Sequence, residues 1–229
     1  MIKQFILTKE KSISYLENKL IKEEIKEERI IPVKEGLLLH STELAFAYYT
    51  ATKNKEKVTQ ALLQAIHYFN EAFVWEGFKY HYGGYDQMIR LLSLGVLCNI
   101  DLDEFNKITT ILQRDGVNDK LLDFIIKGKD PSWEGTSNTY IQEHPYQSLD
   151  SLLEETDNEQ AVKKINYYLD KKWYQGHSDA YWHDNHKNKN VNRYHGYWAF
   201  EVAAVVKILN IEDSSLQQQQ YYPYDAVHW

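Results

Sequence analysis

Apolar residues recur every three or four positions along most of the chain, which is the spacing of one face of an α-helix. The clearest stripe is Val58, Leu62, Ile66, Phe69 and Phe73, at steps of 4, 4, 3 and 4 residues. Similar spacing recurs in the segments 13–20, 37–51, 85–97, 105–112, 121–126, 149–153, 162–173 and 197–210. No stretch of useful length alternates with a period of two. The pattern therefore predicts an all-α protein, a bundle of about eight to ten helices.

Several boundaries follow from individual residues. Pro32 is expected to end the first helix, and Asn118 is placed to cap the helix that contains residues 121–126. The last long helix is expected to run from about Tyr197 to Asn210. The segment 73–85, with three glycines among aromatic residues, fits either a bent connection or a short hairpin.

The helical pattern is interrupted at Gly116. This interruption divides the chain into an N-terminal helical region, 1–116, and a C-terminal helical region, 117–229. No Pro-, Ser- or Gly-rich run surrounds this glycine, so a flexible linker is not expected. We therefore predict two helical subdomains that share one core.

Composition places the chain among folded proteins, because 43% of its 229 residues are hydrophobic and 26% are charged. The longest apolar run, 91–97, is too short for a membrane span, and residues 1–5 lack the pattern of a signal peptide. Cys98 is the single cysteine and has no internal disulfide partner. These features predict a cytoplasmic location. Nothing in the sequence indicates a cofactor, a membrane partner or an oligomeric state.

The net charge of −7 argues against direct nucleic-acid binding, which needs clustered Lys and Arg. The negative charge lies in the middle of the chain. Residues 101–170 carry 15 acidic and 7 basic side chains, a net of −8. Two interpretations stay open for its acidic clusters: they are solvated helix starts, favoured by the helix dipole, or they form a negative patch that steers a basic partner.

Candidate chemistry concentrates in residues 173–201, which hold four of the nine histidines. His183 and His186, with Asp184 between them, are possible metal ligands, and Glu201 is a possible general base. This gives one hypothesis, a metal- or Glu/His-dependent hydrolase. However, the HExxH string of zinc proteases is absent, as are phosphate-binding loops and the GxSxG elbow. The other hypothesis takes Glu201 as a buried polar hub among Tyr, Trp and His side chains, and we favour it.

The C-terminal half also contains a distinctive set of strings. Residues 196–204 read GYWAFEVAA, an instance of GYWxxE followed by two alanines, and DSSL at 213–216 and YYPYD at 221–225 follow it. DKLLDFIIK at 119–127, KWYQGH at 172–177 and YWHDNHK at 181–187 precede it. Together these strings resemble the immunity proteins of the PoNe/PoNi polymorphic nuclease toxin systems. The N-terminal half is similar to that family through a looser pattern in residues 85–105.

This resemblance implies an all-helical bacterial antitoxin, not an enzyme, that binds and inhibits a cognate DNase toxin. Within it, His186, Tyr197, Trp198 and Glu201 become architectural residues rather than catalytic or metal-binding ones. Because nucleases present basic surfaces to DNA, the acidic patch becomes the expected toxin contact. The residues we expect to make it are Glu154, Glu155, Asp157 and Glu159, followed by Asp130 and Glu134. The alternative is a contact through aromatic residues such as Tyr222, Tyr224 and Trp229.

Overall fold

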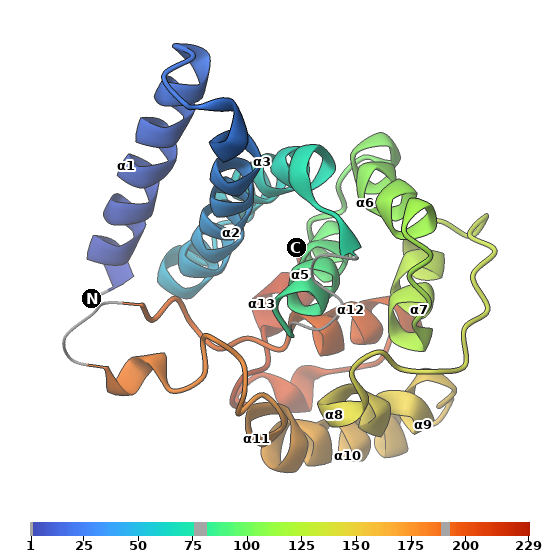
Figure 1. Ribbon diagram of the computed structural model, residues 1–229. Helices are drawn as coiled ribbons and strands as arrows, with labels where there is room; N and C mark the ends of the chain where they lie inside the picture. The colour runs from blue at the N-terminus through green and yellow to red at the C-terminus, as the bar shows by residue number, and fades with distance from the viewer. Residues whose placement is uncertain (1, 76–81, 189–192) are drawn as a thin grey trace.

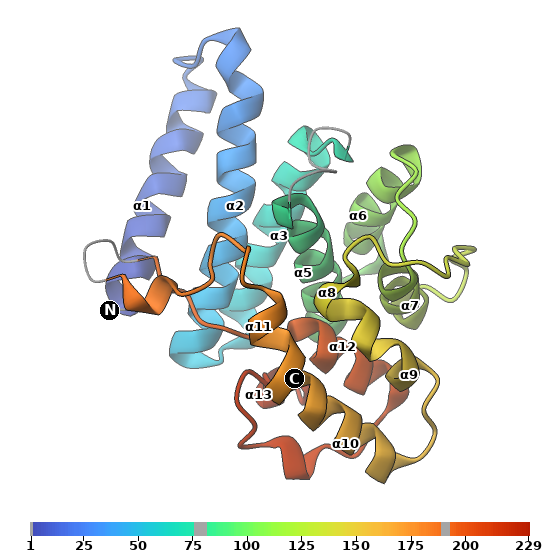
Figure 2. The same ribbon diagram turned by 60° about the horizontal axis from the view of Figure 1, so that its bottom comes forward.

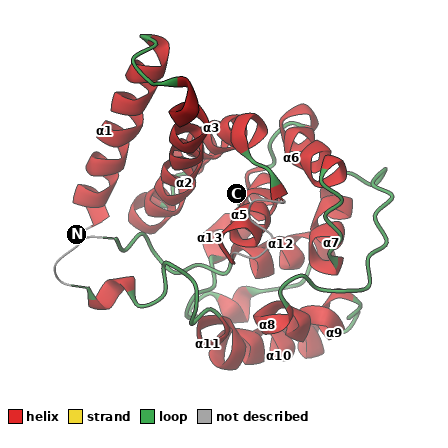
Figure 3. Cartoon of the chain, in the orientation of Figure 1, coloured by secondary structure: helices red, strands yellow, loops and turns green. Residues whose placement is uncertain are grey.

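The computed structural model describes residues 2–75, 82–188 and 193–229, and these residues form helices and loops without strands (Figure 3). The N-terminal half contains α1 (Ile2–Ile21), α2 (Glu27–Thr52), α3 (Lys55–Ala72), α5 (Tyr82–Cys98) and α6 (Leu102–Arg114). The C-terminal half contains α7 (Lys120–Lys129), α8 (Glu143–Tyr146), α9 (Asp150–Leu153), α10 (Asn158–Tyr168), α11 (Tyr174–Gly176), α12 (Phe200–Leu209) and α13 (Tyr224–Val227). The predicted all-α fold is confirmed.

Two helices lie at the centre of the molecule, one from each half of the chain. The central helices are α5 and α12, which pack against each other and against α7 (Figure 1). Helices α1, α2 and α3 form one flank, and α8 to α11 cover the opposite end, which comes forward in Figure 2. Most described side chains of α5 and α12 are buried, as expected for two largely apolar helices at the centre of the core.

Aromatic contacts join the two halves into one core. Phe200 of α12 meets Phe46 of α2 edge to face, with ring centroids 4.7 Å apart, and meets Tyr49 at 5.1 Å. Tyr49 also contacts the indole of Trp229 near the end of the chain, at 5.6 Å. Such pairs stabilise beyond the apolar area that they bury. A single hydrophobic cluster therefore includes residues from both halves, as predicted for two subdomains with a shared core.

The predicted end of the first helix at Pro32 is wrong. Helix α1 ends at Ile21, and the chain turns at residues 22–26, where Glu23 has a φ of 56°. Pro32 lies inside α2. Its fixed φ is helical, and it removes one hydrogen bond, to the carbonyl of Glu28, so the helix continues through it.

Two other predicted boundaries are also corrected. Asp119, not Asn118, caps α7: its carboxylate accepts hydrogen bonds from the backbone N–H groups of Leu121 and Leu122. The last long helix begins at Phe200, so Tyr197 precedes it in extended chain. The ambiguous segment 73–85 lies in part outside the described residues, and its described end, from residue 82, opens α5. None of the described helices is long and apolar enough to cross a membrane.

Candidate functional site

Glu201 lies in the first turn of α12 and is 6% exposed. The hydroxyl of Tyr168 donates a hydrogen bond of 3.1 Å to its Oε1 atom. Burial raises the pKa of this carboxyl to about 7, because the charged form loses its hydration. The cavity beside it has a volume of about 20 Å³, which is room for about one water molecule and for no substrate. This geometry fits the polar hub.

A second buried polar group lies next to this hub. Asp86 and Arg90, one helical turn apart on α5, form an ion pair with Nε and Oδ1 at 2.9 Å. The guanidinium lies 4.4 Å from the ring centroid of Phe46 and 5.5 Å from that of Trp182. Our sequence interpretation missed this pair, although two opposite charges four residues apart inside the apolar segment 85–97 are its signal.

The histidines of residues 173–201 have separate partners. His177 is buried, with Nδ1 2.5 Å from the carbonyl oxygen of Trp173 and Nε2 3.0 Å from the hydroxyl of Tyr146. Burial lowers its pKa to about 3. It lowers the pKa of the buried His195 to about 4. His183 packs against the ring of Tyr174, with centroids 4.2 Å apart. The described part of the chain contains no group of three His, Cys, Asp or Glu side chains arranged to hold a metal.

Residues 196–199 of the GYWxxE motif contact three other parts of the structure. Tyr197 meets His186, its hydroxyl oxygen lying 2.9 Å from Nδ1, and the indole of Trp198 donates to the hydroxyl of Thr50 on α2 at 2.8 Å. Gly196 has a φ of 105°, and a Cβ atom there would collide with the same hydroxyl, so the position requires glycine. The backbone N–H of Ala199 donates to the carbonyl of Tyr221 at 2.9 Å. These contacts hold residues 196–199 extended and delay the start of α12.

The first acidic cluster lies around the start of α10, and nearby lysines pair with three of its four members. Glu154 pairs with Lys120 at 3.4 Å, Glu155 with Lys164 at 2.7 Å, and Glu159 with Lys163 at 2.6 Å. Asp157 caps α10 by accepting from the backbone N–H of Gln160 at 2.8 Å. Asp157 is therefore a helix start, as the first interpretation expects, whereas Glu154 and Glu159 have side chains 79% and 77% exposed. The steering of a basic partner stays a prediction.

Asp130 and Glu134 do not join this cluster. Asp130 caps the C-terminal end of α7, and Lys120, which contacts Glu154, begins the same helix. Ten helical residues separate the two ends by about 15 Å. Glu134 is exposed in the loop that follows α7. The six predicted contact residues therefore form two separate acidic areas.

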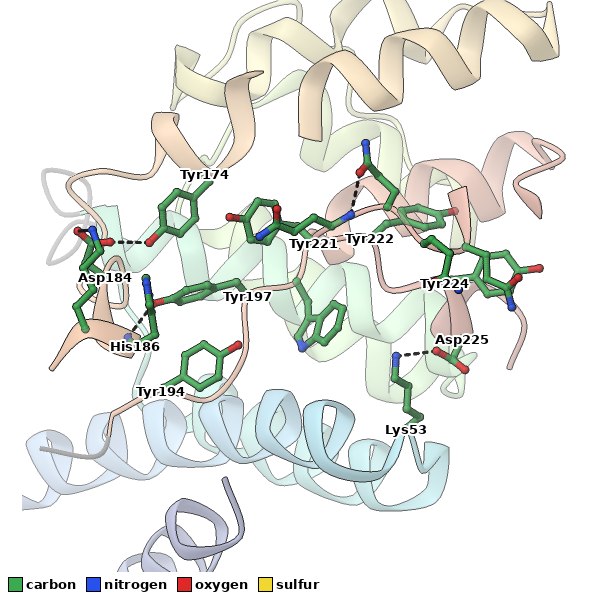
Figure 4. Close-up of a pocket in the computed structure, with 16 residues that line it drawn as sticks. Lys53, Tyr174, Asp184, His186, Tyr194, Tyr197, Tyr221, Tyr222, Tyr224 and Asp225 are labelled. Atoms are coloured by element: carbon green, nitrogen blue, oxygen red, sulfur yellow. Dashed lines mark hydrogen bonds and ion pairs between the residues drawn. The ribbon is translucent and has the colours of Figure 1, made fainter. Parts of the chain in front are cut away.

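A surface cleft of about 720 Å³ brings Tyr222 and Tyr224 together with residues that the sequence did not indicate as one site. It opens between the loop on both sides of His186, the C-terminal segment 217–225 and the end of α2 (Figure 4). Seven of the sixteen residues that line it are Tyr or Trp: Tyr174, Tyr194, Tyr197, Trp198, Tyr221, Tyr222 and Tyr224. One feature of the sequence could have indicated this cleft: four of the six tryptophans lie after position 170.

Both halves of the chain match described protein families. Residues 2–110 match the family described as PoNe immunity protein (PoNi), N-terminal, and residues 117–226 match PoNe immunity proteins (PoNi), C-terminal. No curated protein is similar enough in sequence to count as a match.

A solved structure shares the fold. It is that of protein PA2201 from Pseudomonas aeruginosa, with a TM-score of 0.64 and 17% sequence identity, covering 86% of this chain and 74% of that one. At this level of identity, the likeness concerns the fold alone.

Proposed function

Because this chain belongs to the PoNe immunity protein (PoNi) family, we propose that it binds a bacterial nuclease toxin and inhibits it in the cytoplasm of the cell that makes it. The observation that carries this proposal is the match of both halves to the two parts of the family, which together cover almost the whole chain. The proposed toxin acts on DNA.

We propose that inhibition needs binding alone and no reaction. Glu201 and His177, the candidate acid–base residues, are buried and make hydrogen bonds to other side chains of the protein. The cavity that both residues line holds about one water molecule. The hydrolase hypothesis would need a substrate to reach these groups, and this geometry favours a structural role for them.

The acidic areas support a basic protein as the partner. Glu154 and Glu159 present exposed carboxylates, and residues 101–170 carry a net charge of −8. We propose that Glu154, Glu155, Asp157 and Glu159 attract the DNA-binding surface of the toxin, with Asp130 and Glu134 as a second area. Opposite charges of this kind mainly raise the rate of association. The same charge disfavours binding of this protein to DNA.

Complex formation tests the proposal. The purified protein is mixed with a catalytically inactive form of the nuclease domain of its proposed PoNe toxin, and the mixture is analysed by size-exclusion chromatography with light scattering. We expect one stable complex whose mass is that of the two proteins together. An unrelated nuclease of similar charge is the control and is expected to elute separately. Separate elution of the proposed toxin's nuclease domain at micromolar concentrations would contradict the proposal.

A further inference from the structure

We propose that the aromatic cleft of Figure 4 is the anchoring site for the partner, and that it takes an uncharged, extended segment of the toxin with an apolar or aromatic side chain. This inference rests on the proposed function. It adds a contact surface that is distinct from the acidic residues 154–159. Volume, shape, charge and position each support it.

The volume and composition of the cleft suit a protein segment. Its 720 Å³ lies within the range of about 300–1,000 Å³ that is usual for ligand sites. The rings of Tyr174, Tyr197, Trp198 and Tyr221 are all half-buried, so each has some surface packed in the protein and some left open. Tyr and Trp are enriched at the centres of protein interfaces, because they bury large areas and lose little conformational freedom.

The walls of the cleft are fixed before any partner arrives. The rings of Tyr174 and Tyr221 are parallel within 6°, with centroids 5.4 Å apart, and Tyr194 meets Tyr197 edge to face at 4.9 Å. Tyr221 has a φ of 70°, and such a left-handed backbone is strained for a bulky side chain. Strained residues of this kind gather at binding sites, where the surrounding contacts hold them. A wall that is already ordered lowers the entropy cost of binding.

The charged residues that line the cleft indicate which kind of segment it binds. Lys53 pairs with Asp225 at 2.7 Å, and Lys187 pairs with Asp184 at 2.8 Å, so each of the four charged residues that line the cleft has an opposite charge within the protein (Figure 4). Lys53 also lies 4.9 Å from the ring centroid of Trp198. The paired charges give the cleft no net charge. A charged segment would lose its hydration here without gaining a new partner, whereas an uncharged one stacks on the rings.

Position connects the cleft to the acidic cluster. Gln219, on the rim of the cleft, donates to the side-chain oxygen of Asn166 in α10 at 2.7 Å. Asp157 and Glu159 lie at the start of that helix, about 12 Å away along its axis. One partner of ordinary size therefore reaches both surfaces. In this arrangement, the acidic cluster sets the rate of association and the cleft sets the rate of dissociation.

Variants that change the cleft surface test this inference. Tyr194→Ala and Tyr224→Ala each remove one ring from the wall, and Gln218→Trp adds a bulky side chain at the exposed rim without removing any packed group. The matched control is Tyr15→Ala, because Tyr15 is 58% exposed on α1 and does not line the cleft. Binding of each variant to the inactive nuclease domain is measured by biolayer interferometry, and folding by circular dichroism.

We expect the three cleft variants to weaken binding at least ten-fold, mostly through faster dissociation, and the control to stay within two-fold of the wild type. The inference is overturned if the folded cleft variants all bind within two-fold of the wild type. Should either tyrosine variant fail to fold, Gln218→Trp decides alone, because its site is on the surface. If the wild-type protein itself does not bind the domain, the proposed function fails and the cleft proposal with it. If the wild type binds and the cleft variants bind equally well, the cleft proposal fails but the proposed function stands.

Discussion

The hydroxyl group of Tyr168, at the end of α10, donates a hydrogen bond of 3.1 Å to Oε1 of Glu201 in the first turn of α12. The two residues are 33 positions apart in sequence, and both are buried. This bond links the helix that carries part of the acidic cluster to the central helix of the core. Its removal leaves the Tyr168 hydroxyl without this acceptor inside the protein.

Glu201→Ala should therefore destabilise the fold by about 1–3 kcal/mol, because it removes a buried hydrogen bond to a carboxyl group together with the packed side chain that accepts it. Glu201→Gln is the matched control: it retains an oxygen that accepts the hydrogen bond from Tyr168 and should cost less. Urea unfolding at pH 6 measures both. A stability equal to that of the wild type in Glu201→Ala, together with lost inhibition of the toxin, would indicate a direct functional role instead.

The raised pKa of Glu201 also predicts a pH dependence. The ordinary value is 4.5 and the folded value is about 7, so the folded state binds more protons than the unfolded state between these limits. This group therefore favours folding at pH 4.5, and its contribution declines as the pH rises to 7, by about 3 kcal/mol in all. The measurement is the difference in unfolding free energy between the wild type and Glu201→Gln at pH 5 and pH 7.5. A difference that does not change with pH would show that Glu201 titrates normally.

His177 and His195 predict the opposite trend at lower pH. Their folded pKa values of about 3 and 4 lie below the ordinary value of 6.5, so the unfolded state binds more protons as the pH falls below 6.5. Stability from these two groups is present above pH 6.5 and is lost as the pH falls towards 3 to 4. In His177→Gln, the fall in stability between pH 6.5 and pH 4.5 should be smaller than in the wild type. An equal fall in both proteins would contradict the assignment.

Gly196→Ala should cost more than 1 kcal/mol, because the position has a φ of 105° and the new Cβ would collide with the hydroxyl of Thr50. Gly36→Ala is the control. Gly36 lies inside α2 with no heavy atom within 4 Å of the added Cβ, and alanine is the better helix former, so its variant should be as stable as the wild type or more so. Thermal and urea unfolding of the pair check this contrast. Equal stability of the two variants would mean that the motif does not need its glycine.

Charge reversal tests the acidic cluster. Glu154→Lys with Glu159→Lys should slow association with the toxin and flatten its dependence on salt, because these two side chains are 79% and 77% exposed. The melting temperature should change little, since exposed ion pairs stabilise weakly. Glu23→Lys with Glu24→Lys, in the exposed turn after α1, gives the same change in net charge and serves as the control. Equal association rates in both double variants would remove the steering role.

Charge reversal of all four residues would change the stability of the fold as well as the binding of the toxin. Asp157 caps α10, and Glu155 accepts from Lys164 and from the backbone N–H groups of Thr156 and Asp157. Loss of the cap alone costs about 1 kcal/mol. The fourfold variant should therefore melt at a lower temperature, in contrast to the double variant.

Periodicity predicted the helical segments well, because amphipathic spacing reflects the burial of one face. The stripe from Val58 to Phe69 is buried in α3 as its spacing requires. Helix boundaries predicted from single residues were less accurate. Pro32 lies inside a helix, and Tyr197 lies before one, because tertiary contacts and neighbouring turns decide such boundaries.

Long-range contacts explain what the sequence left out of the candidate site. The burial of Glu201 follows from its place on the apolar face of its helix, but its partner Tyr168 lies on another helix and no local spacing relates the two. The aromatic cleft combines residues from position 53 to position 225, so it exists only in the folded protein. The separation of Asp130 from Glu154 likewise follows from the length and direction of α7.

Inhibition of DNA cleavage tests the central claim most directly. The active nuclease domain of the proposed PoNe toxin is held at a fixed concentration with plasmid DNA, and the wild-type protein is added in increasing amounts. We predict that cleavage falls linearly and stops at one molecule of this protein per nuclease domain, while an unrelated DNase stays fully active in a parallel reaction. Cleavage that continues unchanged at a ten-fold excess of the protein would contradict the account.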